Sequence, residues 1–258
     1  MKNIHYHFSN IAHQYEYLRT TDLEPILFIR KKLKNLTKIN AADIGCGVGR
    51  YDIKLFQHLG KKLHLACIDH NDDMLNELNK NFQGRKIENY KSIRASAMAL
   101  PLEINSLDAI FTFNAVHHFK LLDFLREACR VLKNRSHLFI YTRLRSQNKR
   151  NIWGRFFPEF YQREKHLYEL SELRKTLKRI PILILESIEY FKYRRTAKLE
   201  RLISQASDHH YSTFYFYNKK EFGESLKKFQ ENITRHFQDL NRITWDDENI
   251  LLAIRNNG

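Results

Sequence analysis

The sequence predicts a doubly wound α/β fold, in which a largely parallel sheet carries helices on both faces. Two patterns support this prediction. Short apolar runs typical of buried strands alternate along the chain with segments whose apolar residues recur at helical spacing. In addition, three of the eight glycines fall within five residues, between the first expected strand and the helix after it. With 258 residues, 43% of them hydrophobic, the chain can bury a sizeable core.

The amino-terminal half supplies the clearer elements. Residues 39–44 form a run of small and apolar side chains, which is typical of a buried strand. Residues 51–59 have helical spacing, and Gly60 is expected to end that helix. The elements expected next are a strand over 63–68, a helix capped by Asn71, a strand over 107–113, a helix over 121–132 and a strand over 137–142.

The carboxy-terminal half is less regular. Residues 143–164 are aromatic and basic without a clear period, whereas residues 169–179 have a helical pattern that Pro181 breaks. The last two strands are expected over 182–193 and 249–255. Between them lies a strongly amphipathic helix, which is expected to pack on the domain or on a second copy of the chain. Its apolar face consists of Phe222, Leu226, Phe229, Ile233 and Phe237.

Composition limits the class of protein. Three cysteines, at positions 46, 67 and 129, are too few and too scattered for a disulfide framework or a zinc cage, so we expect reduced thiols. The amino end lacks the apolar segment of a secretory signal. The longest aliphatic run, residues 180–185, is much shorter than the ~20 residues that span a bilayer. We therefore expect a soluble, cytoplasmic protein.

The chain is strongly basic. It has 44 Lys and Arg against 29 Asp and Glu, a formal net charge of +15. Such a charge attracts nucleic acid, anionic lipid or a small acidic substrate. Codon usage that favours lysine would produce the same charge without an anionic partner, and both explanations stay open.

The glycine cluster has the form of a ligand-binding loop. Asp43-Ile44-Gly45-Cys46-Gly47-Val48-Gly49 follows a strand and opens a helix, so bare backbone and a helix amino terminus can face a ligand. Asp69 stands twenty residues after Gly49, where a carboxylate can accept hydrogen bonds from ribose hydroxyls. Arg50 occupies the position of the last glycine in a dinucleotide-binding loop, which argues against NAD. A phosphate-binding Gly-Lys-Ser/Thr sequence is absent too.

The D-x-G-x-G-x-G pattern resembles motif I of the class I S-adenosylmethionine-dependent methyltransferases. Further segments resemble that family in order and spacing, and the resemblance extends over about residues 8–142. These segments are 95–101 (ASAMALP), 105–110 (NSLDAI), 115–119 (AVHHF) and 130–133 (RVLK). The resemblance is to the branch of ubiquinone-type and other small-molecule methyltransferases. It implies a Rossmann-like seven-stranded sheet with an antiparallel last strand, with helical insertions after strand 5 and between the last two strands.

The resemblance also implies one methyltransferase domain over residues 1–258. Its expected parts are an N-terminal helical cover (1–36), a cofactor-binding core (37–145), insertions that cap the substrate (146–182 and 196–245) and the final strands (183–193 and 249–255). No linker, repeat or low-complexity segment interrupts this arrangement.

By position, the resemblance assigns S-adenosylmethionine contacts. The methionine end of the cofactor would be held by Asp43 and the backbone of Gly45, Cys46 and Gly47, and Arg19 is a candidate for its carboxylate. Asp69 would bind the ribose, and His70 would flank the adenine. Ser96 and Ala97 would border the adenine edge, and Asn114 would lie beneath the sulfonium.

Two positions depart from the family: Ser96 where Asp is usual, and Arg135-Ser136 where Gly-Gly is usual.

Methyl transfer needs alignment and exclusion of water rather than a metal or a covalent nucleophile. For an acceptor that loses a proton, His117 and His118 are candidate general bases, because histidine titrates near neutrality; each could instead pack or cap the next helix. Tyr211 lies in an unusual run, residues 209–217 (HHYSTFYFY), which could line an acceptor pocket, form a packed strand or contact a second subunit. Tyr211 is the third catalytic candidate.

The acceptor is less well defined. We expect a small molecule that carries a carboxylate, because a basic run follows strand 5: Arg143, Arg145, Lys149, Arg150 and Arg155.

RNA is the alternative, supported by the net charge, by residues 191–195 (FKYRR), and by the likeness of DIGCGVGRY and AVHHF to tRNA wobble-uridine methyltransferases. A third alternative is a non-catalytic regulatory protein that binds the cofactor. Whether the chain forms a homodimer is left open by the sequence.

Overall fold

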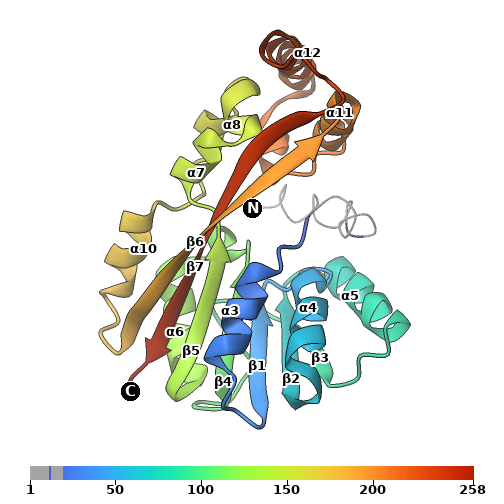
Figure 1. Cartoon of the computed structure of the whole chain (residues 1–258). Helices are drawn as coiled ribbons and strands as arrows, with labels where there is room; N and C mark the ends of the chain where they lie inside the picture. The colour runs from blue at the N-terminus through green and yellow to red at the C-terminus, as the bar shows by residue number, and fades with distance from the viewer. Residues whose placement is uncertain (1–11, 13–19) are drawn as a thin grey trace. The chain divides into compact units, whose positions relative to one another are not determined.

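Figure 1 shows the chain as a computed structural model, which describes residue 12 and residues 20–258. The described residues form two compact units. The sheet unit contains residues 12, 20–142, 170–189 and 250–258, and the helical unit contains residues 143–169 and 190–249. The expected single domain with inserted segments stays a prediction.

A seven-stranded sheet has the strand order β3-β2-β1-β4-β5-β7-β6 (Figure 1). Strands β1 to β5 pair in parallel, and β7 is antiparallel to β5. The predicted seven-stranded, Rossmann-like sheet with an antiparallel last strand is therefore confirmed. The strands are β1 (Ile39–Ile44), β2 (Leu63–Asp69), β3 (Tyr90–Arg94), β4 (Leu107–Phe113), β5 (Leu132–Thr142), β6 (Leu183–Ala197) and β7 (Ile243–Asn256).

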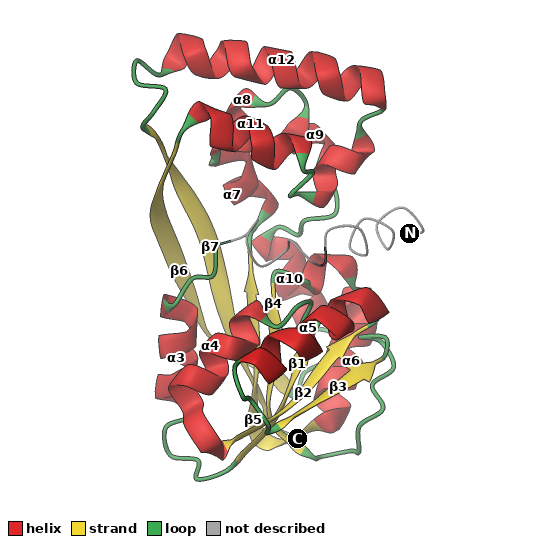
Figure 2. Cartoon of the chain, turned by 90° about the vertical axis from the view of Figure 1, so that its right-hand side faces the viewer, coloured by secondary structure: helices red, strands yellow, loops and turns green. Residues whose placement is uncertain are grey.

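Helices of the sheet unit cover both faces of the sheet, as right-handed crossovers require (Figures 1 and 2). One face carries α3 (Glu24–Lys32), α4 (Arg50–Leu59) and α5 (Asp72–Gly84), and the other carries α6 (Leu121–Val131) and α10 (Leu170–Leu177). The helix starts follow local chemistry: the side chain of Asn71 caps α5 by accepting the N–H groups of Asp73 and Met74 at 3.0 and 3.1 Å. That predicted cap is confirmed.

The helical unit has an aromatic core of its own. Its helices are α7 (Arg145–Arg150), α8 (Ile152–Phe156), α9 (Phe160–Arg163), α11 (Leu199–Ser207), the 3₁₀ helix η4 (Ser212–Phe216) and α12 (Lys219–His236). The rings of Trp153 and Phe229 stack with centroids 5.0 Å apart. The predicted apolar face of α12 is confirmed, because Phe229 and Ile233 are fully buried in this core. The insertions predicted after strand 5 and between the last two strands are likewise helical.

Several predicted boundaries were wrong. β5 begins at Leu132 instead of residue 137, and its register against β4 shifts where Arg135 has a left-handed backbone (φ 65°). This bulge lies where the sequence departs from the usual Gly-Gly. β6 extends to Ala197 and β7 begins at Ile243, beyond the predicted bounds. Of the three alternatives for residues 209–217, the packed strand is excluded for residues 212–216, which form η4. No helix within the described residues is long and apolar enough to cross a membrane.

Candidate cofactor site

The glycine-rich loop lies at the carboxyl end of β1, which is an interior strand of the sheet. β1 pairs with β2 on one side and with β4 on the other, so the loop lies where the two halves of a doubly wound sheet diverge and ligands usually bind. The N–H groups of Gly45 and Cys46 donate to the carbonyl oxygen of Ile68 at 2.7 and 3.2 Å, which holds the loop to β2. Gly49 is the N-cap of α4.

The three glycines of the loop have left-handed backbones but serve different purposes. Their φ angles are 76° at Gly45, 56° at Gly47 and 80° at Gly49. A Cβ on Gly45 would lie 2.5 Å from the Cβ of Ala115, and one on Gly49 would lie 2.6 Å from the ring of Phe82. A Cβ on Gly47 would meet only a methionine sulfur at 4.0 Å. Packing therefore requires the outer two glycines, whereas the space beside Gly47 is open to a ligand.

Asp69, the last residue of β2, connects the loop to the next helix. Its Oδ2 accepts the N–H of Gly47 and its Oδ1 accepts the N–H of Asn71, each at 3.0 Å. Oδ2 has a second lone pair that can accept a hydroxyl group. The imidazole of His70 is exposed and lies 3.6 Å from Asp69, and its hydrogen bond to that carboxylate raises the pKa of His70. Asp69 is thus fixed in place and still able to accept a ribose hydroxyl.

A second acidic group lies beneath the loop. Asp43, near the end of β1, is 2% exposed, and Asp52, in the first turn of α4, is 0% exposed. Oδ1 of Asp43 and both carboxyl oxygens of Asp52 lack a conventional hydrogen-bond partner within the part of the chain that the structure describes. Burial raises the pKa of Asp43 well above its ordinary value and that of Asp52 to about 6, and the two carboxyls also influence each other's pKa.

Two thiols adjoin this acid pair. Burial raises the pKa of Cys46 and raises that of Cys67 to about 12, so both thiols stay protonated near neutral pH. Both cysteines are free. The side chain of Cys46 is therefore a neutral neighbour of the acids, which agrees with the expectation that only its backbone would bind a ligand.

The loop after β3 carries the predicted adenine contacts. The N–H of Ala95 donates to the carbonyl of Asp69 at 3.0 Å, so this loop starts beside the predicted ribose carboxylate. Oγ of Ser96 accepts the N–H of Met98 at 3.2 Å, and Ala97 is buried. The hydroxyl of Ser96 therefore stabilises the turn that begins at Ser96. The presence of Ser where the family usually has Asp does not reveal this contact.

An ion pair on α6 holds the loop after β3 in place. Glu127 accepts the N–H of Leu100 at 2.8 Å, and Arg130 donates to the carbonyl oxygens of Leu100 and Leu102 at 2.9 and 2.8 Å. The guanidinium of Arg130 also holds Glu127 through two hydrogen bonds of 2.8 Å, and this lowers the pKa of Glu127. Such two-pronged pairs combine strength with geometric precision.

The segment after β4 carries the remaining predicted site residues of the sheet unit. Asn114 has a left-handed backbone (φ 53°), and its N–H donates to the carbonyl oxygen of Tyr141 at 2.7 Å. A strained non-glycine residue at a strand end is often part of a functional site. His117 and His118 belong to the 3₁₀ helix η3 (Val116–His118), with ring centroids 4.1 Å apart; His117 is half-buried and His118 is exposed.

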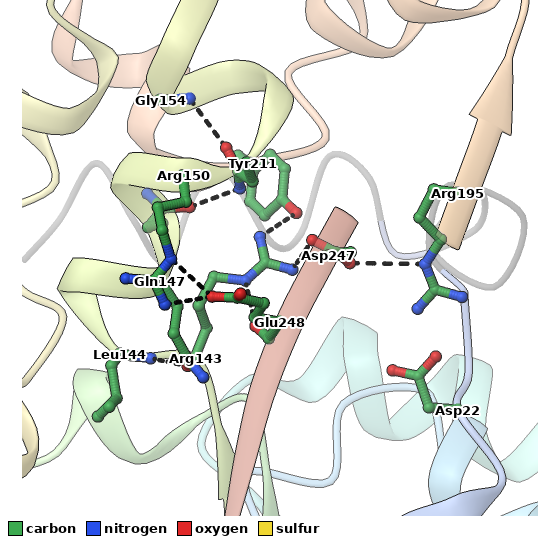
Figure 3. A network of polar contacts seen from close by, with 12 residues as sticks. Asp22, Arg143, Leu144, Gln147, Arg150, Gly154, Arg195, Tyr211, Asp247 and Glu248 are labelled. Atoms are coloured by element: carbon green, nitrogen blue, oxygen red, sulfur yellow. Dashed lines mark hydrogen bonds and ion pairs between the residues drawn. The ribbon is translucent and has the colours of Figure 1, made fainter. Parts of the chain in front are cut away.

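The structure thus brings most of the predicted residues together at one edge of the sheet unit. Arg19 lies outside the described residues. Tyr211 belongs to the helical unit, where its hydroxyl accepts a hydrogen bond from Arg143 at 3.0 Å (Figure 3). Arg143 also pairs with Asp247 and donates to the carbonyl oxygen of Glu248 at 3.2 Å. The roles of Arg19 and Tyr211, like those of the two histidines, stay predictions.

The basic run after β5 divides into two groups. Arg143 and Arg150 are paired with acids, since Arg150 binds Glu248 (Figure 3). Arg145 and Lys149 instead lie over the ring of Tyr161, 5.0 and 5.5 Å from its centroid. Nε of Arg145 is buried without a hydrogen-bond partner among the described residues. The run is therefore only partly neutralised within the helical unit.

Comparison with known proteins agrees with this geometry. A family model described as a methyltransferase domain matches residues 42–140. A demethylmenaquinone methyltransferase of Listeria welshimeri is 28% identical over 109 residues, which are 40% of this chain and 46% of that protein. The mouse tRNA (carboxymethyluridine(34)-5-O)-methyltransferase ALKBH8 is 23% identical over 154 residues, 58% of this chain and 21% of that protein. The chain thus spans less than half the length of these curated relatives.

The fold has solved counterparts. The YcgJ protein of Bacillus subtilis superposes with a TM-score of 0.63 and 15% identity, over 91% of this chain and 99% of that one. At this identity the likeness shows the fold alone. Because the superposition covers most of this chain, the likeness is not limited to residues 42–140.

Proposed function

We propose that the chain is a class I S-adenosylmethionine-dependent methyltransferase, which transfers a methyl group from this cofactor to a small-molecule acceptor. The observation that carries the proposal is the loop at residues 43–49, tied to Asp69 by the N–H of Gly47. The described residues fit the cofactor, because a Cβ at Gly47 would fill an otherwise open space and because buried carboxyl oxygens at Asp43 and Asp52 lack donors.

In this proposal each group has a separate task. Asp69 holds the ribose, Gly47 admits the ligand against bare backbone, and the loop fixed by Arg130 borders the adenine. When bound, S-adenosylmethionine supplies a methyl group already activated by the positive sulfur. The protein then needs to position the acceptor, exclude water and accept a proton where the acceptor loses one. His117 and His118 are our candidates for that last task.

A small acceptor agrees with the demethylmenaquinone methyltransferases among the relatives. An acidic group on that acceptor is supported by Arg145 and Lys149, whose charges have no carboxylate partner among the described residues. Both follow β5 closely in the chain. In this proposal they attract an anionic acceptor to the protein. A cytoplasmic location and a homodimer stay predictions.

RNA is the second candidate acceptor. It is favoured by the match to the mouse tRNA methyltransferase, which covers more of this chain than the demethylmenaquinone match does, and by the net charge of +15. If RNA is bound, affinity must fall steeply with added salt, because binding releases counterions from the phosphates. A salt-independent affinity for bulk tRNA would exclude this candidate.

The experiment that tests the function is transfer of labelled methyl groups from S-adenosylmethionine into a fractionated cell extract. We expect label among small solutes, and an acidic acceptor would be retained on an anion-exchange resin. Label in the RNA fraction would favour the second candidate and contradict the first. Cofactor binding without label in any fraction would support a non-catalytic regulatory protein instead.

A further inference from the structure

Asp43 and Asp52, the acid pair beneath the glycine loop, lie together in a way that the conformation of the loop does not require. Asp43 and Asp52 come from different elements, the end of β1 and the first turn of α4, yet both carboxyl groups are buried. Three of their four oxygens have no conventional hydrogen-bond donor within the described residues. Two adjacent buried carboxylates cannot both stay ionised, because each repels the other in a medium that screens charge poorly.

Among the residues that the structure describes, no positively charged side chain acts on the pair. The neighbouring titratable groups are the thiols of Cys67 on β2 and Cys46 in the loop, and the carboxylate of Asp69 at the end of β2, while the backbone at Ile44 hydrogen-bonds Asp43. The thiol of Cys67 is a weak donor, and Asp69 is a further anion. A proton between the two carboxyl groups would supply the donor that their oxygens lack and would remove one negative charge.

We propose that Asp43 and Asp52 share a single proton in the ligand-free protein, and that this proton leaves for the solvent when the ammonium group of the cofactor's methionine end enters the site. The ammonium group then takes over the compensation of charge that the proton provided. Asp52 acts through Asp43 and is therefore a positioning residue of the cofactor site. This inference rests on the family's cofactor and is independent of the acceptor.

The test is calorimetric titration with S-adenosylhomocysteine at pH 7 in buffers of different ionisation enthalpy, such as phosphate and Tris. The dependence of the binding enthalpy on the buffer gives the number of protons released. We expect about half to one proton per ligand for the natural chain, because the pair titrates as a coupled unit. 5′-Methylthioadenosine, which lacks the ammonium group, should bind without releasing a proton.

The variant Asp52→Asn keeps the shape of the side chain and removes its titration. It should still bind S-adenosylhomocysteine but release clearly less of a proton than the natural chain, because Asp43 loses the neighbouring carboxylate that helps to hold its proton. Asp73→Asn is the matched control, because Asp73 lies exposed in the first turn of α5; it should behave like the natural chain. Proton release unchanged in Asp52→Asn, or absent in the natural chain, would overturn the inference.

A measurement on the natural chain alone keeps the test independent of how the variant folds. The affinity for S-adenosylhomocysteine should weaken as the pH falls from 7 to 5, because protons then compete with the ammonium group for the acid pair. An affinity that does not change over this range would contradict the shared proton. Failure of S-adenosylhomocysteine to bind at any pH would instead contradict the cofactor itself, so the two failures are distinguishable.

Discussion

At the scale of single residues, the loop glycines separate a packing requirement from a binding requirement. Gly45→Ala places a methyl group 2.5 Å from Ala115, so the fold must shift. Gly47→Ala meets no such contact and adds only the strain of a left-handed alanine, about 1–2 kcal/mol. We expect Gly45→Ala to lower the melting temperature more, and Gly47→Ala to lose affinity for S-adenosylhomocysteine while staying folded. Unchanged affinity in a folded Gly47→Ala protein would contradict a ligand at that position.

Asp52 gives a prediction about stability. Its pKa is raised to about 6 by burial, so the folded chain holds the proton more tightly than the unfolded chain does. The favourable contribution of protonated Asp52 is complete below about pH 4 and is lost as the pH rises through 6. Asp52→Asn cannot ionise, and we expect it to be more stable than the natural chain at pH 7–8.

Denaturant titrations between pH 4 and 8 measure this difference. The stability advantage of Asp52→Asn should shrink as the pH falls towards 4, where Asp52 of the natural chain is protonated. Parallel stability profiles of the two proteins would show that Asp52 is not destabilising when charged. A stabilising substitution at this position would mean that the natural chain keeps a destabilising charge for binding, as functional sites often do.

Sequence reasoning found the residues that belong to local patterns and missed those that depend on tertiary contacts. Spacing identifies the glycines and Asp69, the resemblance to motif I adds Asp43, and the structure gathers these residues at one edge of the sheet. Asp52 resembles any acid in the first turn of a helix, where solvent exposure is usual. Only the packing of α4 on the sheet reveals that Asp52 is buried beside Asp43.

At the scale of elements, helix α6 connects packing to the site. Its buried face holds the sheet, while Glu127 and Arg130 fix residues 100–102 of the loop after β3. In the sequence these two residues are spaced like an ordinary surface ion pair three positions apart. No local signal distinguishes them from Asp123 and Arg126 one turn earlier, which pair at 3.5 Å on the surface.

That similarity supplies a matched experiment. Arg130→Met removes two hydrogen bonds to loop carbonyls and the partner of Glu127, so we expect a loss of about 1.5–3 kcal/mol in stability and a weaker affinity for S-adenosylhomocysteine. Arg126→Met should change neither quantity by more than about 0.5 kcal/mol, because exposed pairs contribute little. Equal effects of the two substitutions in thermal unfolding would contradict a special role of Arg130.

The final strands show why element boundaries were misjudged. β6 was expected to end at residue 193, but it continues through a charged segment to Ala197. Within the helical unit, Arg194 and Lys192 on β6 pair with Asp246 on β7 at 3.3 and 3.0 Å. Cross-strand pairs of opposite charge stabilise such a ribbon. The partner charges lie about fifty residues away in the sequence, so no local pattern predicts them.

At the scale of the whole molecule, the fold and the cofactor followed from sequence, whereas the acceptor did not. The cofactor loop is a short local motif on a sheet whose strands alternate regularly with helices. An acceptor is recognised by side chains that the fold draws from separate segments, and their chemistry differs widely among proteins of one fold. The net charge of +15 is shared by both candidate acceptor classes and does not separate them.

The central claim is that residues 43–49 and Asp69 hold S-adenosylmethionine, and calorimetric titration with S-adenosylhomocysteine tests it most directly. We predict one ligand per chain, and for Asp69→Ala a loss of about 1.5–3 kcal/mol in binding free energy, the contribution of a hydrogen bond to a charged group. Absence of binding to the natural chain, or an equal affinity in a folded Asp69→Ala protein, would contradict the claim.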